Sequence, residues 1–354
     1  MEWNNELTKV LKIKYPIIQA PMLGVTTPEM VAAISNQGGL GSLPVGGLSP
    51  EKTVALIRKT KALTAAPFAV NLFTNSLPLV PPHENYDLMQ DLLQKVAMEN
   101  GFHFEKRSPA LLKFYPYTEQ VALLISESIP IVSFTFGILE SGALTALKES
   151  NIVLIGTATC LEEAKILDEI GIDIITAQGL EAGGHRGTFL EGIPLPMIGS
   201  MSLIPLLSKN IQKPIVAAGG INDGKSIKAA FILGAKGVQI GTAFIGSDES
   251  LAIPSYKEAL RNSNDTDTIL TKSFSGRWAR GLRNKFITEV EKSGIEIPAY
   301  PIQAGLVSPI RMEAQRKDNK EFAALWAGQS ASTSGNKPAA DIFNNLIEQV
   351  EGSG

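Results

Sequence analysis

The chain has 354 residues, of which 44% are hydrophobic and 19% charged, and its formal net charge at pH 7 is −3. This length and composition are typical of a large α/β protein, and the slightly acidic balance gives no reason to expect nucleic acid or a membrane surface as a partner. The single cysteine, Cys160, excludes an internal disulfide and favours the reducing cytoplasm as the expected location. No apolar run approaches the length that spans a bilayer, and residues 1–14 lack the apolar core of a secretory signal.

Short apolar runs alternate with helical stretches along most of the chain. Because these runs are apolar throughout, they are typical of parallel strands that are covered on both faces. The expected strands are residues 16–20, 39–43, 67–71, 130–134, 152–156, 173–177, 214–218 and 237–241. Strands in this number, with helices between them, predict a (β/α)8 TIM barrel, and the alternative is a doubly wound open sheet.

Several expected helices carry start signals. Asp223 is a candidate N-cap before an apolar stripe, and Pro28 and Pro50 lie where the first turn of a helix tolerates proline. Residues 159–162, Thr-Cys-Leu-Glu, have the form of a capping box. We therefore expect a helix to begin at each of these points.

Two regions interrupt the alternation. Residues 77–117 are rich in proline and are expected to form an insertion after the third strand, with a helical piece at 86–98. Residues 246–312 show no clear strand alternation and are expected to form a mostly helical cap that serves as a substrate domain. The predicted organisation is a barrel over residues 1–245, this cap, and a return to the barrel over residues 313–354.

The seventh and eighth expected strands both end in glycine. Gly219 and Gly220 follow the seventh strand, and residues 239–242, Gln-Ile-Gly-Thr, end the eighth. In barrels the loops after these two strands often hold a phosphate on backbone N–H groups, and glycine permits the close approach. The alternative is that each glycine only turns the chain, but their position on adjacent strands favours a phosphate site.

Amide side chains are expected at the carboxyl ends of three strands. These are Asn71, Gln178 and Gln239. Buried amides need hydrogen-bond partners, and amides at strand ends can recognise the edge of a neutral heterocycle. Residues 20–22, Ala-Pro-Met, provide an apolar edge suited to a flat aromatic ring, although a plain turn would need no ligand.

His185 lies in a glycine-rich loop, residues 178–187, Gln-Gly-Leu-Glu-Ala-Gly-Gly-His-Arg-Gly. An unperturbed imidazole titrates near neutrality and can accept a proton at physiological pH. The glycines leave the ring accessible to a ligand, so we expect His185 to be the catalytic base. Arg186 is expected either to be solvated or to attract an anion, and His83 and His103 are expected on the surface.

Together these motifs resemble the nitronate monooxygenases, a flavin-dependent family formerly called 2-nitropropane dioxygenases. The segments that carry the resemblance are residues 19–22, 38–41, 70–73, 178–187, 217–221 and 239–242. The resemblance implies a TIM barrel with FMN at its C-terminal face. It further implies oxidation of alkyl nitronates, such as propionate 3-nitronate, by O₂ to a carbonyl compound and nitrite, without NAD(P)H.

The resemblance also implies roles for single residues. His185 falls on the catalytic base, which would deprotonate a neutral nitroalkane or hold the anionic nitronate, and Tyr300 falls near the substrate pocket. The residues expected to contact FMN, from the resemblance and from the strand-end pattern, are Ala20, Pro21, Met22, Asn71, Gln178, Gly183, Gly219, Gly220, Gln239, Ile240, Gly241 and Thr242. No metal site is expected, and the oligomeric state is left open between monomer and homodimer.

Two other functions stay open from the sequence. One is an FMN- and NAD(P)H-dependent enoyl-(acyl-carrier-protein) reductase, whose family shares the barrel and an Ala-Gly-Gly-His loop. The basic residues 277–285, expected as a solvated or cap-packing face, would then serve a carrier protein. The other is a non-catalytic barrel that senses a phosphorylated metabolite and would survive replacement of His185.

Overall fold

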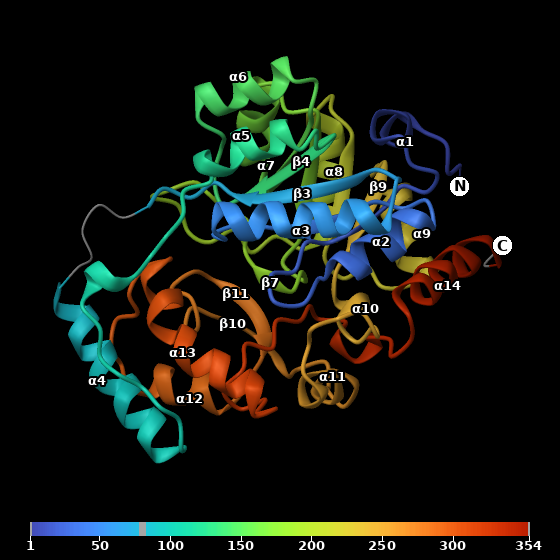
Figure 1. Ribbon diagram of the computed structural model, residues 1–354. Helices are drawn as coiled ribbons and strands as arrows, with labels where there is room; N and C mark the ends of the chain where they lie inside the picture. The colour runs from blue at the N-terminus through green and yellow to red at the C-terminus, as the bar shows by residue number, and fades with distance from the viewer. Residues whose placement is uncertain (1, 78–82, 353–354) are drawn as a thin grey trace.

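The computed structural model describes residues 2–77 and 83–352. Residues 78–82 of the predicted insertion lie outside the described residues, as does the side chain of His83. Eight parallel strands are hydrogen-bonded in the order β1-β9-β8-β6-β5-β4-β3-β2, and a parallel bridge between Ile18 and Leu40 joins the two ends of this order (Figure 1). The predicted TIM barrel is therefore confirmed, and the open sheet is not the fold.

The barrel strands lie where the apolar runs predicted them, within two residues at each end. Their bounds are β1 Ile17–Gln19, β2 Gly41–Pro44, β3 Phe68–Phe73, β4 Ile131–Thr135, β5 Val153–Ala158, β6 Ile174–Gln178, β8 Ile215–Ala218 and β9 Gly237–Ile240. Side chains on both faces of these strands are buried, as expected when helices cover a parallel sheet.

A helix begins at each of the four predicted start signals, namely α2, α3, α7 and α9. The bounds of the helices around the barrel are α1 Glu6–Leu11, α2 Pro28–Asn36, α3 Pro50–Leu63, α5 Thr118–Ser126, α6 Ser141–Glu149, α7 Leu161–Glu169, α8 Ser200–Asn210, α9 Gly224–Ile232, α10 Thr242–Ile245 and α14 Ala339–Gly352. Asp223 caps α9 by accepting from Ser226 N at 2.7 Å. The capping box predicted at residues 159–162 is wrong, because Cys160 is the N-cap and makes no side-chain bond there. α14 packs against α9 and α2 on the outside of the barrel.

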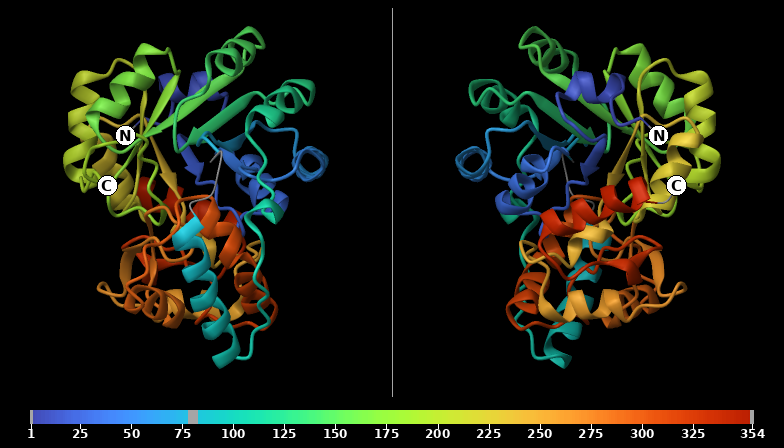
Figure 2. Two further views of the ribbon diagram at one scale, coloured as in Figure 1. Left: turned by 90° about the vertical axis from the view of Figure 1, so that its left-hand side faces the viewer. Right: turned by 90° about the vertical axis from the view of Figure 1, so that its right-hand side faces the viewer.

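A second layer covers the carboxyl ends of the barrel strands and is called the cap below. It consists of α4 His83–Glu99, α11 Pro254–Arg261, β10 Thr268–Thr271, β11 Ala279–Leu282, α12 Lys285–Lys292 and α13 Ile302–Arg316, and 3₁₀ turns occur at Pro109–Leu111 and Ala331–Thr333. α4 packs against α13, and Figures 1 and 2 show it on the cap side of the molecule, away from the barrel. The helix of the insertion thus extends the cap.

The cap contains strands that the sequence pattern did not indicate. β10 and β11 pair antiparallel, and β11 also pairs with β7, the two-residue strand Gly184–His185. The sequence of β11, Ala-Arg-Gly-Leu, has no apolar run, so nothing in its composition marks it as a strand. Its pairing with β7 ties the histidine loop of the barrel to the cap.

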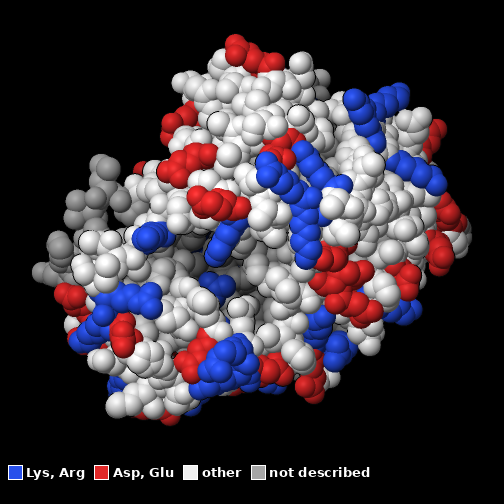
Figure 3. All heavy atoms as spheres, in the orientation of Figure 1, with Lys and Arg blue, Asp and Glu red and all other residues white. Residues whose placement is uncertain are grey.

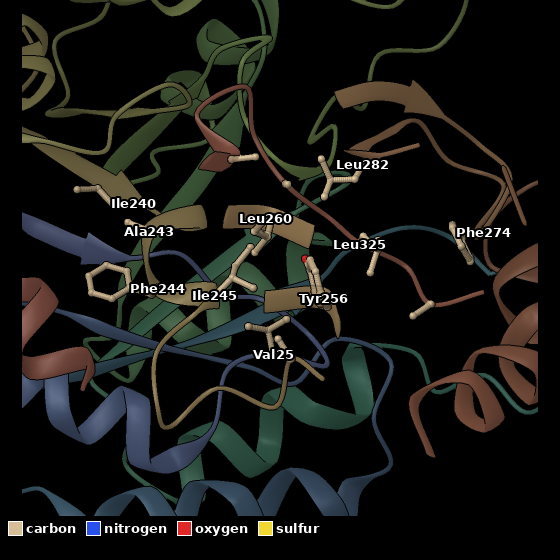
Figure 4. Packing of buried hydrophobic residues seen from close by; sticks show 14 of the residues in the cluster. Val25, Ile240, Ala243, Phe244, Ile245, Tyr256, Leu260, Phe274, Leu282 and Leu325 are labelled. Carbon is tan, nitrogen blue, oxygen red and sulfur yellow. The ribbon is translucent and has the colours of Figure 1, made fainter. Parts of the chain in front are cut away.

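The barrel and the cap share one hydrophobic core. Ile240 of β9 and Phe244 of α10 belong to the same buried cluster as Leu282 and Phe274 of the cap (Figure 4). Shared burial of this kind stabilises the contact between the two layers and fixes their relative position. Within residues 2–77 and 83–352, no helix is long and apolar enough to cross a membrane.

Candidate active site

A cavity of about 270 Å³ lies at the carboxyl ends of the barrel strands, between the barrel and the cap. This volume is far larger than a single water molecule needs and suits a small-molecule ligand. Space-filling atoms show one face of the molecule hollowed, with Lys or Arg atoms inside the hollow (Figure 3). The predicted site residues that line the cavity are Ala20, Pro21, Met22, Asn71, Gln178, Gly183, His185, Gly219, Gly220, Gln239, Gly241, Thr242 and Tyr300.

One predicted cofactor contact does not line the cavity. The side chain of Ile240 is 1% exposed and packs in the core shared by the barrel and the cap. Side chains of a strand alternate between its two sides, so Ile240 points away from the wall to which Gln239 contributes. Sequence reasoning took the four residues 239–242 as one segment and missed this alternation.

Amide and hydroxyl groups form the barrel side of the cavity. Asn71 is buried and donates from Nδ2 to Ser133 Oγ at 3.0 Å, which fixes the orientation of its amide. Thr176 Oγ1 is buried and has no hydrogen-bond partner among the described residues. Because buried hydroxyl groups rarely lack a partner, this atom is the structural sign that a polar ligand completes the wall.

Gln178 holds the histidine loop as well as lining the cavity. Its Nε2 donates to the His185 carbonyl at 3.0 Å, and its Oε1 accepts from Gly187 N at 2.8 Å. Both ends of the amide are thus bonded to the loop backbone. The predicted contact between Gln178 and a flavin stays a prediction.

Glycines form the wall where chain segments approach closely. A Cβ atom on Gly183 would lie 2.4 Å from the backbone nitrogen of Gly328, so a larger residue does not fit. Gly219 and Gly220 have φ values of +107° and +74°, which favour glycine. Thr242 Oγ1 accepts from Gly328 N at 3.0 Å and keeps its own proton for donation to a ligand.

Arg186 binds backbone carbonyl groups at the start of the histidine loop, residues 178–187. It is fully buried, and its guanidinium donates to Gly179 O at 2.6 Å and to Gln178 O at 3.2 Å. The prediction that Arg186 is solvated or attracts an anion is therefore wrong. Its guanidinium is used to bind backbone carbonyl oxygens of its own loop.

Glu163 is a buried carboxylate that the sequence did not single out. It accepts from Thr159 N at 2.6 Å, Thr159 Oγ1 at 2.7 Å, Thr188 Oγ1 at 2.6 Å and Phe189 N at 2.7 Å. These bonds tie the residues after His185 to the start of α7. They also explain why the predicted capping box fails, since Thr159 is bonded to Glu163 and not to Glu162.

His185 is positioned by both layers. It lies on β7, in register with Ala279 of β11. Its Nε2 lies 2.8 Å from Ser275 Oγ. The ring centroid lies 5.5 Å from that of Phe136 and 5.3 Å from that of Trp326, so aromatic rings limit its motion.

Two arginines influence the charge state of His185. The pKa of His185 is lowered to about 3, first by burial and then by the positive charges of Arg277 and Arg311. The imidazole is half-buried and faces the cavity, so partial burial and the two positive charges act together against its protonated form. The expected near-neutral titration is therefore absent, and the imidazole is neutral at physiological pH. Burial also raises the pKa of Tyr300 to about 12, so its phenol keeps its proton.

The basic run 277–285 is not a solvated surface at its first arginines. The guanidinium of Arg277 lies 4.2 Å from the ring centroid of Phe136, and its Nε donates to Arg186 O at 3.3 Å. Arg280 is 6% exposed and donates to Leu180 O at 3.0 Å. Because Arg280 is buried, and Arg277 is half-buried and stacked on Phe136, these two side chains do not form the docking face that a carrier protein would need.

Arg311 was missed by sequence reasoning altogether. It lies on α13, four residues after the buried Val307 and three before the buried Ala314, and it lines the cavity. A charged residue within the apolar stripe of a helix is the signal that could have found it. Phe136 lacks any such signal, because it follows β4 at a positive φ of 79° in an otherwise ordinary strand exit.

Comparison with known proteins gives consistent results. The profile of the nitronate monooxygenase family matches residues 4–349. A protein of Staphylococcus saprophyticus called probable nitronate monooxygenase is 43% identical over 352 residues, covering 99% of this chain and 98% of the relative. The solved structure of nitroalkane oxidase from Streptomyces ansochromogenes superposes with a TM-score of 0.89 at 32% identity, covering 98% of each chain.

A more distant solved structure is FabK from Thermotoga maritima. It superposes with a TM-score of 0.76 at 28% identity, covering 99% of this chain and 97% of that chain. Both values are lower than those of the nitroalkane oxidase, so the fold is shared more loosely. With a family profile that spans residues 4–349 and a relative at 43% identity, the chain belongs to the nitronate monooxygenase family of oxidoreductases.

Proposed function

We propose that this enzyme uses FMN and O₂ to oxidise alkyl nitronates, such as propionate 3-nitronate, to a carbonyl compound and nitrite. The observation that carries the proposal is a cavity in which a barrel wall of amides, hydroxyls and glycines meets His185, Tyr300 and Arg311. Family membership supports the reaction class, and the family is flavin-dependent in general. The single cysteine suits action in the reducing cytoplasm. The cavity volume suits a small-molecule substrate.

The residues of the barrel wall fit FMN. The apolar edge at residues 20–22 suits the flavin ring, and the amides of Asn71 and Gln239 suit its polar rim. Gly219 and Gly220 allow backbone to approach a phosphate, and Thr242 offers a hydroxyl donor. The unpartnered Thr176 hydroxyl would gain a partner. When bound, the flavin supplies the capacity to take electrons from the nitronate and deliver them to O₂.

His185 acts on the substrate as a neutral hydrogen-bonding group in this proposal. A pKa of about 3 makes the imidazole a weak base until negative charge enters the cavity. Ser275 Oγ, 2.8 Å from Nε2, fixes the ring orientation. Tyr300 keeps its phenol proton and can donate it to a substrate oxygen. The aromatic rings around His185 exclude water from the reacting atoms.

The decisive assay supplies ethyl nitronate to the purified protein in air without NADH, and measures O₂ uptake and nitrite release. We expect both signals in a yellow protein whose spectrum is that of FMN. His185→Asn is expected to lower turnover at least tenfold with the flavin retained, in the range found for a positioned catalytic group. His103→Asn is the matched control, because His103 lies on the surface with an 80% exposed side chain.

The same preparation tests the two other functions. Reduction of an enoyl thioester by NADH, with no nitrite from the nitronate, would replace the proposal with the enoyl reductase. A colourless protein that binds a phosphorylated metabolite and ignores both substrates would replace it with the sensor.

A further inference from the structure

The two full charges in the cavity lining are not paired with each other. Among the described residues that line the cavity, only Arg311 and Glu181 carry full charges. Both carboxylate oxygens of Glu181 are bonded to Ser200, at 2.9 and 3.0 Å from the backbone nitrogen, and Ser200 Oγ donates to Oε2 at 2.9 Å. The Glu181 carboxylate is therefore bonded to the start of α8, and among the described residues it forms no ion pair with Arg311.

Arg311 also lacks hydrogen-bond partners. Its Nε is buried and unbonded, and no carboxylate among residues 2–77 and 83–352 forms an ion pair with it. A guanidinium offers five N–H donors in a planar fork, and burying it without a partner costs free energy. This cost is recovered if an anion binds, because a charged pair in a poorly hydrated site is strongly attractive.

The surroundings of Arg311 indicate whether the anionic group that it binds belongs to the substrate or to the cofactor. Its charge acts on His185 and on Tyr300, the two side chains assigned to the substrate. The glycines suited to a phosphate, Gly219 and Gly220, lie instead at the end of β8 on the barrel side. The anion that Arg311 meets is therefore carried by the substrate and not by the cofactor.

We propose that Arg311 binds the negatively charged nitronate group and makes the enzyme select the nitronate over the neutral nitroalkane. This inference rests on the proposed function. An alkyl nitronate has its single negative charge on two oxygens in a plane, which matches the planar fork of a guanidinium. A nitroalkane of the same shape is neutral and leaves the buried guanidinium without compensation.

Binding of the anion has a consequence for His185. The two arginines hold the histidine neutral, so an anion placed against Arg311 offsets part of their effect and raises the pKa of His185. The imidazole then becomes a better hydrogen-bond partner and proton acceptor only when substrate is present. In this proposal Arg311 binds the substrate anion, and its charge also influences the pKa of His185.

The kinetic test compares Arg311→Gln with Arg316→Gln. Arg316 lies on the same helix and its side chain is 73% exposed. Its replacement by Gln removes the same charge as Arg311→Gln. For Arg311→Gln we expect KM for ethyl nitronate to rise about ten- to hundredfold, as for a lost charged hydrogen bond, with little change for nitroethane. Arg311→Lys keeps the charge and is expected to restore part of the affinity. An unchanged KM for ethyl nitronate in Arg311→Gln would refute the proposal.

A binding test does not depend on turnover. Inorganic nitrate is a planar anion that the holoenzyme can bind without reaction, and calorimetry measures its affinity. The chain has three histidines, so their ring signals can be followed by NMR and the His185 signal assigned with His185→Asn. We expect nitrate to raise the pKa of His185 in the wild type and in Arg316→Gln, and Arg311→Gln to bind nitrate at least tenfold more weakly.

The two tests separate the inference from the proposed function. If nitronates are not oxidised but nitrate binds through Arg311, the anion site stands and the reaction is wrong. If nitronates are oxidised and Arg311→Gln binds nitrate as well as the wild type, the reaction stands and the inference is overturned. Should Arg311→Gln fail to fold, Arg311→Lys and Arg311→Met provide the charged and uncharged comparison.

Discussion

The barrel wall and the cap bring different chemistry to the same cavity. The barrel supplies amides, hydroxyls and glycines, and Glu181, the carboxylate in the described lining, is bonded to Ser200. The cap supplies Tyr300 and Arg311, and its Arg277 stacks on Phe136. Neutral donors and acceptors suit a heterocycle, whereas unpaired positive charge suits a small anion. If the barrel holds FMN and the cap selects the substrate, as proposed, the difference predicts that the two functions can be changed separately while the junction between the layers is left intact.

The largest loss of stability is expected at the junction between the two layers, where Gly183 lies against Gly328. In Gly183→Ala the new Cβ meets backbone atoms of Gly328 and Ala327 at 2.4 and 2.5 Å, which cannot rotate away. We expect the free energy of unfolding to fall by about 1–3 kcal/mol, as for an overpacked site, and the flavin to be lost during purification. Thermal denaturation and the absorbance of flavin relative to protein measure the two effects.

Gly142→Ala is the control for that substitution. Gly142 lies in α6, where an added Cβ meets no atom within 4 Å, so stability is expected to be unchanged or slightly higher. A Gly183→Ala protein that is as stable and as yellow as the wild type would show that the barrel loop and the segment at Gly328 move independently.

An intermediate effect is expected at the barrel side of the histidine loop. Glu163→Gln replaces an acceptor of four hydrogen bonds by an amide that can accept at one end only. The free energy of unfolding is expected to fall by about 1–3 kcal/mol, and amide hydrogen exchange at residues 186–189 to accelerate. Glu162→Gln removes the same charge from the exposed neighbouring position and is expected to change neither. Equal exchange in the two variants would mean that the cap alone holds the loop.

At neutral pH the smallest effect on stability comes from the charge state of His185, and its growth on acidification tests the lowered pKa of this barrel histidine. The unfolded chain protonates His185 below its ordinary pKa of 6.5, but the folded protein does so only near pH 3. The unfolded state therefore binds more protons in this window, and His185 lowers the free energy of unfolding as pH falls from 6.5 toward 3. Urea unfolding of the wild type and His185→Asn from pH 4 to 8 measures this contribution. A difference between them that does not change with pH would contradict the lowered pKa.

The barrel was predictable because its strands are continuous apolar runs. Once the strands were located, their carboxyl ends followed, and with them the cavity positions of Asn71, Gln178 and Gln239. Ile240 was misjudged because the alternation of side chains along β9 was ignored. Helix starts were predictable where a proline or an aspartate marks them. At α7 the start was also located, but the capping box was wrong because Glu163, one residue beyond the expected position, takes over the bonds of Thr159.

The charge chemistry was not predictable, because it depends on residues far apart in the chain. The sequence around Arg186 does not reveal that carbonyl groups of its own loop turn back to meet its guanidinium. The pKa of His185 is governed by burial and by Arg277 and Arg311, which come from distant segments of the cap. Local patterns predict which residues reach a site, whereas the electrostatic state of those residues depends on the three-dimensional packing.

The pairing of β7 with β11 has a consequence for exchanging parts between relatives. His185 is in register with Ala279, and Gly184 with Arg280, so the histidine loop takes its shape partly from a strand of the other layer. A chimaera that inherits the loop 178–187 from one parent and β11 from the other would combine two backbones that have not been matched. We expect a chimaera to keep the histidine in place only when the loop 178–187 and β11 are taken from the same parent.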